Sequence, residues 1–140
     1  MRRTSGFTLV EMMVVIVIIG ILATVLITQI SGRADKAKVE ATKAIVKQVA
    51  DAAEMFKLDH NRYPERLDDL MRMPAYVDGR KWPPGGYLKK LPRDGWDREL
   101  VYRVPGSAGQ PLDVVSFGED GREGGEGYAE DLWNHDAYKR

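Results

Sequence analysis

A long apolar stretch near the amino terminus constrains this chain more than any other feature of its sequence. Residues 12–27 carry no charged side chain, and Thr24 is their only polar residue. A helix rises about 1.5 Å per residue, so a stretch of about 20 residues crosses a hydrocarbon core of about 30 Å. The wider segment 7–30 is interrupted only by Glu11 and a few threonine and glutamine side chains. We therefore expect residues 7–30 to form a transmembrane helix.

Two ordinary interpretations of this stretch leave part of it unexplained. A secretory signal peptide is cut behind its apolar core, whereas here the apolar run continues past Ala23. A plain single-span anchor fits the length but gives no reason for Glu11. A carboxylate is costly inside a membrane, and an ionisable residue there is by default a functional one that requires a partner.

Composition excludes several classes of function. The chain has 140 residues, 21 Lys+Arg against 21 Asp+Glu, and no cysteine. Its length allows one small domain, and zero net charge argues against a nucleic-acid-binding protein. The lack of cysteine excludes disulfides and thiol chemistry. Since the sequence also contains no nucleophile–base pair and no phosphate-binding loop, we predict that the protein is not an enzyme.

A short basic segment precedes the apolar stretch. Residues 2–6 read RRTSG, and residues 7–11 read FTLVE. This arrangement resembles the class III signal of type IV pilins and pseudopilins. The resemblance implies that a prepilin peptidase removes residues 1–6 by cutting between Gly6 and Phe7, that Phe7 is then N-methylated, and that Glu11 directs assembly. Pairing of Glu11 with the Phe7 amine of a neighbouring subunit would offset the desolvation of both charges.

Helical periodicity continues beyond the membrane segment. No proline occurs before Pro64, and one apolar face recurs at helical spacing. The residues on this face are Ile45, Val49, Ala52, Ala53 and Phe56. We expect one helix from Thr8 to Leu58, with residues 31–58 as its soluble half packed on a small domain.

We expect residues 59–140 to form a small globular domain. Arg66–Met71 is expected to form a short helix. Two strands, Glu99–Val104 and Leu112–Phe117, are expected to form a hairpin across a turn rich in glycine and proline. The predicted fold class is α+β: one long amino-terminal helix packed on a small antiparallel sheet, with a metal-binding loop near the carboxyl end.

Residues 85–92 read GGYLKKLP and residues 94–97 read DGWD. This order resembles the major pseudopilins of type II secretion (general secretion pathway protein G family), which have a type IV pilin-like fold. Family members tend to show D-P-W-G here, so Gly95 and Asp97 depart from the pattern. The resemblance implies a single-pass protein of the bacterial inner membrane with its carboxyl-terminal domain in the periplasm. It further implies a homopolymeric periplasmic pseudopilus that supports export of folded proteins across the outer membrane.

The same resemblance implies several partners. These are other copies of the chain, minor pseudopilins, the inner-membrane secretion platform and the prepilin peptidase. Two alternatives stay open: a minor pseudopilin or type IV pilin subunit, and a membrane-anchored calcium-dependent binding module. The lack of cysteine argues against type IV pilins, which commonly close a carboxyl-terminal loop with a disulfide.

Residues 113–136 are rich in acids and glycine, with Arg122 as the only basic residue apart from His135. Calcium prefers oxygen ligands from carboxylates and carbonyls, which glycine-rich backbone can direct to one centre. Ser116–Gly121 also resembles the S-x-G-x-D-G calcium loop of the major pseudopilins, with a later Asp-Leu. That resemblance implies Ca²⁺ ligands from Asp120, Glu130, Asp131 and the Phe117 carbonyl, with Ser116 and Gly127 as weaker candidates. The alternative is a solvated acidic loop, and His135 is expected at the surface.

Overall fold

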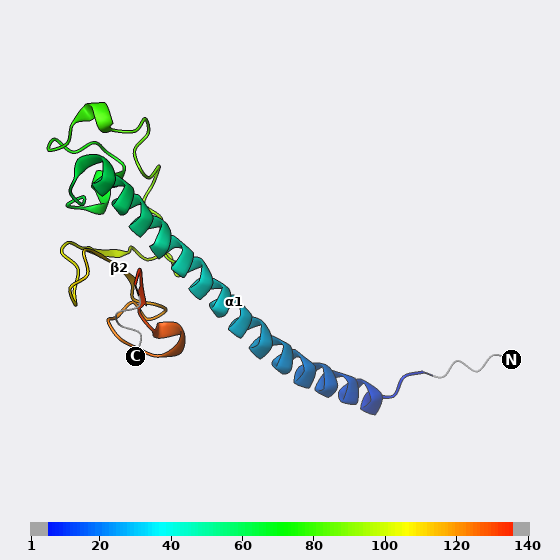
Figure 1. Ribbon diagram of the computed structural model, residues 1–140. Coiled ribbons are helices and arrows are strands. Elements are labelled where there is room, and N and C mark those ends of the chain that lie inside the picture. Colours follow the sequence, from blue (N-terminus) through cyan, green and yellow to red (C-terminus); the bar gives the residue numbers. More distant parts are fainter. Residues whose placement is uncertain (1–5, 136–140) are drawn as a thin grey trace. The chain divides into compact units, whose positions relative to one another are not determined.

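The computed structural model describes residues 6–135, apart from the side chains of residues 25–31 (Figure 1). Residues 1–5 of the predicted leader (1–6) and the last residue of the expected calcium loop, Asp136, therefore lie outside the described residues. The chain divides into two compact units, Met1–Asp35 and Lys36–Arg140.

Helix α1 (Leu9–His60) confirms the long helix expected from Thr8 to Leu58. It ends at Asn61, whose φ of 56° is left-handed and whose backbone N–H donates to the Lys57 carbonyl at 2.7 Å. An asparagine in this conformation is a common helix terminator. Within the described residues, which leave out the side chains of 25–31, we find no helical stretch that is long and apolar enough to cross a membrane.

The core of the second unit confirms the predicted apolar face of the helix. Val49, Ala52, Ala53 and Phe56 are buried, and so is Val46, which the periodicity did not single out; Ile45 is only half-buried. These side chains pack against apolar residues from the rest of the unit, namely Leu70, Leu88, Leu100, Leu112 and Val114. Each fully buried aliphatic or aromatic side chain of this kind contributes about 1.5–3 kcal/mol.

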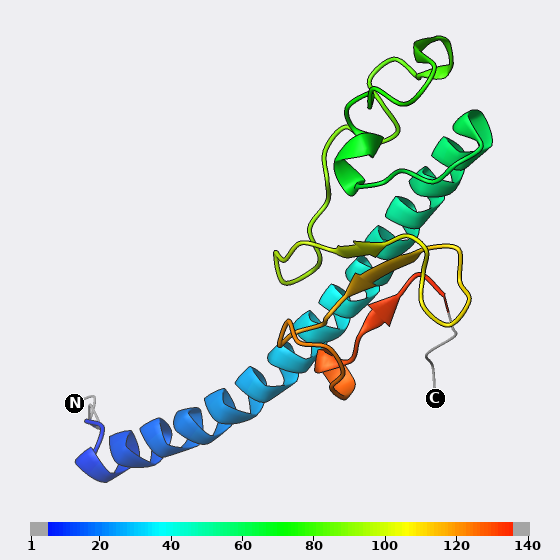
Figure 2. The ribbon, with the colours of Figure 1, turned by 90° about the vertical axis from the view of Figure 1, so that its left-hand side faces the viewer.

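In the described residues, three short strands form an antiparallel sheet in the order β1-β2-β3. Strand β1 (Val101–Arg103) pairs with β2 (Asp113–Ser116), with Tyr102 opposite Val114, which confirms the predicted hairpin. Strand β3 (Leu132–Trp133) pairs with the other edge of β2 and was not predicted. Figure 2 shows the strands side by side along the part of α1 that belongs to the second unit.

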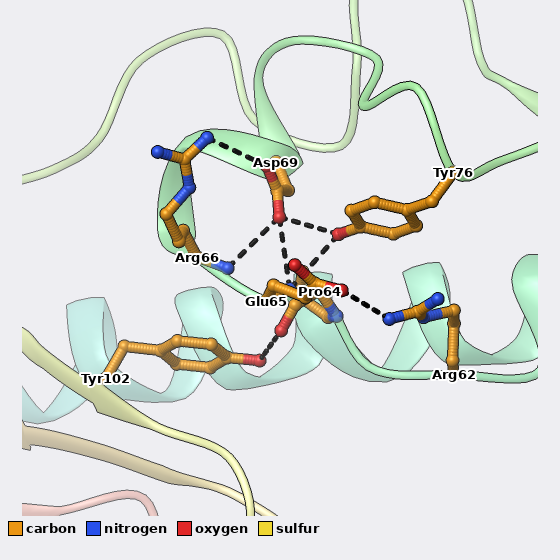
Figure 3. Close-up of polar contacts among 7 residues, drawn as sticks. All are labelled: Arg62, Pro64, Glu65, Arg66, Asp69, Tyr76 and Tyr102. Atoms are coloured by element: carbon orange, nitrogen blue, oxygen red, sulfur yellow. Dashed lines mark hydrogen bonds and ion pairs between the residues drawn. The ribbon is translucent and has the colours of Figure 1, made fainter.

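The helix expected at Arg66–Met71 is a 3₁₀ helix, η1 (Leu67–Leu70), held by the buried carboxylate of Asp69 (Figure 3). Asp69 Oδ2 accepts hydrogen bonds from the backbone N–H groups of Glu65 and Arg66 and from the Tyr76 hydroxyl, the last at 2.6 Å. One carboxylate thus accepts from backbone donors that precede this helix, and the Glu65 N–H also donates to the Tyr76 hydroxyl at 3.1 Å.

The same region is fixed to the sheet from the other side. The Tyr102 hydroxyl on β1 donates to the Pro64 carbonyl at 2.9 Å. Two further 3₁₀ helices, η2 (Gly79–Lys81) and η3 (Gly127–Ala129), lie in the connections. Segment 64–76 is consequently held between the end of α1 and the first strand.

Candidate functional site

The amino-terminal unit presents its predicted processing site outside the helix. Residues 6–8 have no regular secondary structure and are exposed, and the Phe7 side chain is 81% exposed. A peptide bond must leave helical geometry to enter a protease active site, because helical hydrogen bonds occupy its N–H and carbonyl groups. The bond between Gly6 and Phe7 lies ahead of the first helical residue, Leu9, and meets that requirement.

Glu11 has a hydrogen-bond partner within its own chain. The backbone N–H of Thr8 donates to Glu11 Oε2 at 2.8 Å, and the Thr8 hydroxyl accepts from the Glu11 N–H at 3.2 Å. This reciprocal pair is a capping box, which satisfies donors at the start of a helix. The sequence analysis missed this role, although threonine followed three residues later by glutamate is its recognisable pattern.

The helix that follows carries an apolar surface on all its described sides. Between Phe7 and Leu22 its large apolar side chains are exposed by 44% to 81%. Monomeric soluble proteins rarely expose a contiguous apolar patch of this kind, and a helix that is apolar all round is covered by lipid or by other helices. This surface therefore requires lipid or other helices to cover it.

The acidic loop begins later than its composition suggested. Asp113–Ser116 forms strand β2, so the loop proper starts at Phe117 and ends where β3 begins at Leu132. Its first turn closes through the Gly121 N–H, which donates to the Phe117 carbonyl at 3.1 Å. The Glu119 N–H donates to the Tyr128 carbonyl at 2.9 Å, which ties the beginning of the loop to its end.

Asp131 is the most unusual carboxylate of this loop. One oxygen, Oδ2, accepts from the Gly124 N–H at 2.9 Å, whereas Oδ1 is buried without a hydrogen-bond partner among the described residues. Burial raises the pKa of Asp131, the Gly124 bond offsets part of that rise, and Glu123 and Asp120 raise the pKa further. A buried, unpaired carboxylate oxygen beside other acids is where a cation would stabilise the fold.

The other predicted Ca²⁺ ligands are exposed or already accept hydrogen bonds. Glu130 is exposed, and Asp120 accepts a hydrogen bond from the backbone N–H of Arg122 at 3.0 Å. The Gly127 carbonyl accepts from the Glu130 N–H at 3.4 Å. No three acidic or imidazole side chains in the described part of the chain converge as a metal-binding group.

Ser116, one of the weaker ligand candidates, is engaged elsewhere. Its buried hydroxyl donates to Asp94 Oδ2 at 2.7 Å and accepts from the Gly118 N–H at 3.3 Å. Asp94 Oδ1 accepts from the backbone N–H groups of Trp96 and Arg98. The Gly95 N–H donates to the Thr42 hydroxyl of α1 at 2.8 Å, so this network connects the helix to the start of the loop.

A groove of about 1060 Å³ lies beside the loop within the second unit. Lys43 of α1 and Arg103 of β1 line it together with loop residues that include Glu126 and Asp131. Opposite charges thus face one groove. The nearby Arg103 acts against the acids on the pKa of Asp131, without cancelling their effect.

His135 is not the surface residue that the sequence suggested. Its side chain is 13% exposed, and its Nε2 lies 2.8 Å from Oδ1 of the fully buried Asp113. Asp113 also accepts hydrogen bonds from the backbone and hydroxyl of Ser107. Burial raises the pKa of Asp113, but the bonds from Ser107 and His135 outweigh burial and hold that pKa below its ordinary value. This pair fixes the end of β3 to β2.

Two families of known proteins match this chain, one over its amino-terminal segment and one over most of the remainder. A family described as type II secretion system (T2SS), protein G, matches residues 29–135. The prokaryotic N-terminal methylation motif matches residues 1–27.

Individual relatives are similar over almost the whole chain. The type II secretion system core protein G of Pseudomonas aeruginosa is 44% identical over 139 residues, covering 96% of this chain and 97% of that protein. The core protein G of Vibrio cholerae is 39% identical over 137 residues, covering 96% and 93%. The crystal structure of the major pseudopilin from the type 2 secretion system of enterohaemorrhagic Escherichia coli is similar with a TM-score of 0.60 and 30% identity. That similarity covers 74% of this chain and 87% of the other.

Proposed function

The chain belongs to the type II secretion system protein G family and is a structural subunit of the pseudopilus; we propose that it enters that fibre from the inner membrane, after cleavage before Phe7. The observation that carries this proposal is the exposed apolar surface of residues 7–22. Residues 7–30 would lie in the membrane before assembly and in the fibre core afterwards.

The physical basis of such a fibre lies in the amino-terminal unit. An all-round apolar helix exchanges lipid for neighbouring helices at little cost, because both environments are apolar. The position of each subunit along the fibre then requires a polar contact. A cut before Phe7 creates an α-amino group four residues from Glu11, and pairing between subunits would fix that position. The fibre would support export of folded proteins together with minor pseudopilins and an inner-membrane platform.

Processing is tested by mass spectrometry of the chain expressed with and without a prepilin peptidase. The proposal expects loss of residues 1–6 and a methylated Phe7 only when the peptidase is present. A chain that keeps residues 1–6 in the presence of an active peptidase would show that it is a plain membrane anchor.

We further propose that the acidic loop binds Ca²⁺, as its resemblance to the family's calcium loop implies. Asp131 with its unpaired buried Oδ1 would hold the ion, together with carboxylates of Asp120 and Glu130 and the Phe117 carbonyl. A bound divalent cation would supply the positive charge that allows Asp131 to keep its Oδ1 buried while the carboxylate is ionised. The Gly127 carbonyl remains a weaker candidate, and the bond between Ser116 and Asp94 speaks against Ser116.

The calcium proposal is tested by thermal unfolding of the full chain in detergent. A ligand at 100 times its Kd stabilises a folded protein by about 2.7 kcal/mol, or roughly 10–20 °C for a domain of about 100 residues. We expect such a rise in Tm between EDTA and millimolar calcium. Equal Tm values in the two conditions would reject the calcium site and leave the fibre proposal intact.

A further inference from the structure

Arg98 contacts the acidic loop from outside it. The residue follows the turn at Asp94–Asp97 and is half-buried. Its guanidinium Nη1 donates to the Gly118 carbonyl at 2.7 Å, although 20 positions separate the two residues. Hydrogen bonds that involve a charged group are shorter and stronger than neutral ones, so this contact is a candidate anchor for the loop.

The guanidinium also packs against a second loop residue. A Cβ atom placed on Gly121 would lie 2.9 Å from Arg98 Nε, 3.1 Å from Cδ and 3.2 Å from Cζ. The side chain of Arg98 therefore lies directly against the Gly121 backbone, which has a φ of 68°. Arg98 thus contacts both glycines of the first turn, the turn that the Gly121 N–H closes onto Phe117.

The first turn in turn supports the end of the loop. A Cβ on Gly118 would lie 2.8 Å from the Glu130 and Tyr128 carbonyl oxygens, so the two backbone segments are in close contact. Asp131 follows directly in the chain. A displacement of Gly118 would therefore move the segment that carries this half-buried carboxylate.

Arg98 is itself held at its backbone. Its N–H donates to Asp94 Oδ1 at 2.8 Å, and its carbonyl accepts from the Asp94 N–H at 2.9 Å. The guanidinium consequently extends from a closed turn towards the loop. Such a pre-positioned side chain loses less freedom when it forms its contacts.

From these contacts we propose that Arg98 is a positioning residue that holds the first turn of the acidic loop, residues 117–121, in place before any cation binds. The part of this proposal that concerns cation affinity rests on the proposed calcium site. Without a cation, the loop's excess of carboxylates repels itself, and Arg98 supplies both a counter-charge and a donor. Cation binding then has less backbone to order, which strengthens it.

The test compares three variants of the full chain in detergent, Arg98→Gln, Arg98→Lys and the control Arg93→Gln. Arg93 is an exposed arginine that contacts Asp97 and Glu99 rather than the loop. The first measurement is hydrogen exchange of the Gly121 amide in EDTA, where no cation contributes. We expect Arg98→Gln to speed this exchange about tenfold, Arg98→Lys to restore part of the protection, and Arg93→Gln to leave it unchanged.

The second measurement is calcium titration by calorimetry. Arg98→Gln is expected to weaken Ca²⁺ binding about tenfold, with Arg98→Lys between it and the starting protein. Unchanged hydrogen exchange of the Gly121 amide in Arg98→Gln would overturn the proposal. Tighter calcium binding in that variant would also overturn it, because it would mean that Arg98 repels the ion. If the starting protein binds no calcium, the calcium site fails, and the exchange measurement still decides the role of Arg98. Should Arg98→Gln fail to fold, Arg98→Lys provides the same comparison.

Discussion

The carboxylate of Asp94 accepts a hydrogen bond from the Ser116 hydroxyl at 2.7 Å, although 22 positions separate the two residues in the chain. Both side chains are buried. Asp94 also accepts from the backbone N–H groups of Trp96 within its turn and of Arg98 just after it, and Ser116 is the last residue of β2. One buried carboxylate therefore connects the turn, the central strand and the beginning of the acidic loop.

Replacement of Asp94 should destabilise the second unit more than replacement of its partner. Asp94→Ala leaves the donors of Trp96, Arg98 and Ser116 unpaired, at a cost of about 3 kcal/mol, whereas Ser116→Ala removes one bond at about 1 kcal/mol. Urea unfolding of the full chain in detergent with EDTA measures the loss of unfolding free energy in each variant. Equal costs would show that Asp94 does not act as the common acceptor.

Gly95 should not tolerate a side chain. A Cβ there would lie 2.6 Å from the Lys38 carbonyl oxygen of α1, and backbone cannot move aside cheaply. We expect Gly95→Ala to cost about 1–3 kcal/mol in urea unfolding. The control is Gly79→Ala, where a Cβ would meet the flexible Met73 side chain at 3.3 Å. A Gly95→Ala protein as stable as the control would contradict this packing.

The D-P-W-G pattern, from which this chain departs, would place a proline at position 95. Proline has no backbone N–H, whereas the Gly95 N–H donates to the Thr42 hydroxyl at 2.8 Å. The neighbouring departure, Asp97, has a φ of 63°, a left-handed conformation that glycine adopts without strain. Gly95→Pro should therefore destabilise this chain beyond Gly95→Ala, although it restores the pattern.

Removal of the charge on Asp131 should have opposite effects with and without calcium. Because the pKa of Asp131 is raised in the fold, ionisation of this group opposes folding at pH above that pKa, and the penalty disappears below the unfolded value of 3.8. At pH 7 in EDTA, Asp131→Asn should have a Tm equal to or a few degrees above the starting protein. In millimolar calcium it should lose the roughly 10–20 °C stabilisation.

Glu126→Gln is the matched control for this experiment. Glu126 is exposed, lines the same groove and is not a predicted ligand. It should keep the calcium-dependent rise in Tm. A full calcium response in Asp131→Asn would mean that the ion binds elsewhere.

The pair of Asp113 and His135 should make the fold acid-sensitive. A carboxylate whose pKa is lowered in the fold stabilises it above the unfolded value, here 3.8, and loses that contribution as pH falls through the folded pKa. Asp113→Asn should cost about 3 kcal/mol at pH 7, since it weakens charge-assisted bonds to a buried group.

The pH dependence separates this charge effect from simple packing damage. The difference in unfolding free energy between Asp113→Asn and the starting protein should shrink as pH falls below about 4. Unfolding at a series of pH values measures it. A difference that is constant with pH would show that the charge of Asp113 contributes nothing.

Glu11 is expected to be required for assembly rather than for cleavage. Glu11→Ala should be processed and methylated at Phe7 and yet form no fibres, because the subunit amine loses its partner. Thr8→Val is the control, since it removes the hydroxyl of the capping box and keeps the carboxylate. Electron microscopy of sheared material measures the number of fibres that each variant forms. Normal fibres from Glu11→Ala would assign Glu11 to helix capping. Loss of fibres in Thr8→Val, with fibres retained in Glu11→Ala, would lead to the same assignment.

Local patterns predicted much of the fold. The helix was predictable to within two residues because its apolar periodicity and the absence of proline act along one segment. The hairpin of β1 and β2 was predictable because a turn separates two alternating runs. Strand β3 was not, since two residues inside an acidic, glycine-rich segment have no pattern of their own; they form a strand only because β2 offers a free edge.

For the acidic loop, the sequence predicted the kinds of residue that it contains but not their individual surroundings. Glycines and acids in fixed order indicated a cation loop, but nothing near Asp131 in the sequence distinguishes it from Glu130 or Asp120. The distinction arises from burial, which leaves one Asp131 oxygen unpaired. Arg98 and Asp94 were missed for the same reason, because their partners lie 20 and 22 positions away.

The sequence by itself determined what the apolar segment must do. Its length and its lack of charge predict a helix that needs lipid or neighbouring helices, and the resemblance of residues 2–11 to a class III signal implies a processed subunit. That information is local, because transfer of a helix into an apolar environment depends on its own side chains. The tertiary structure decided which polar groups of the second unit are satisfied and which are not. Burial and hydrogen bonding depend on residues brought together from distant positions, and no single segment of the chain specifies them.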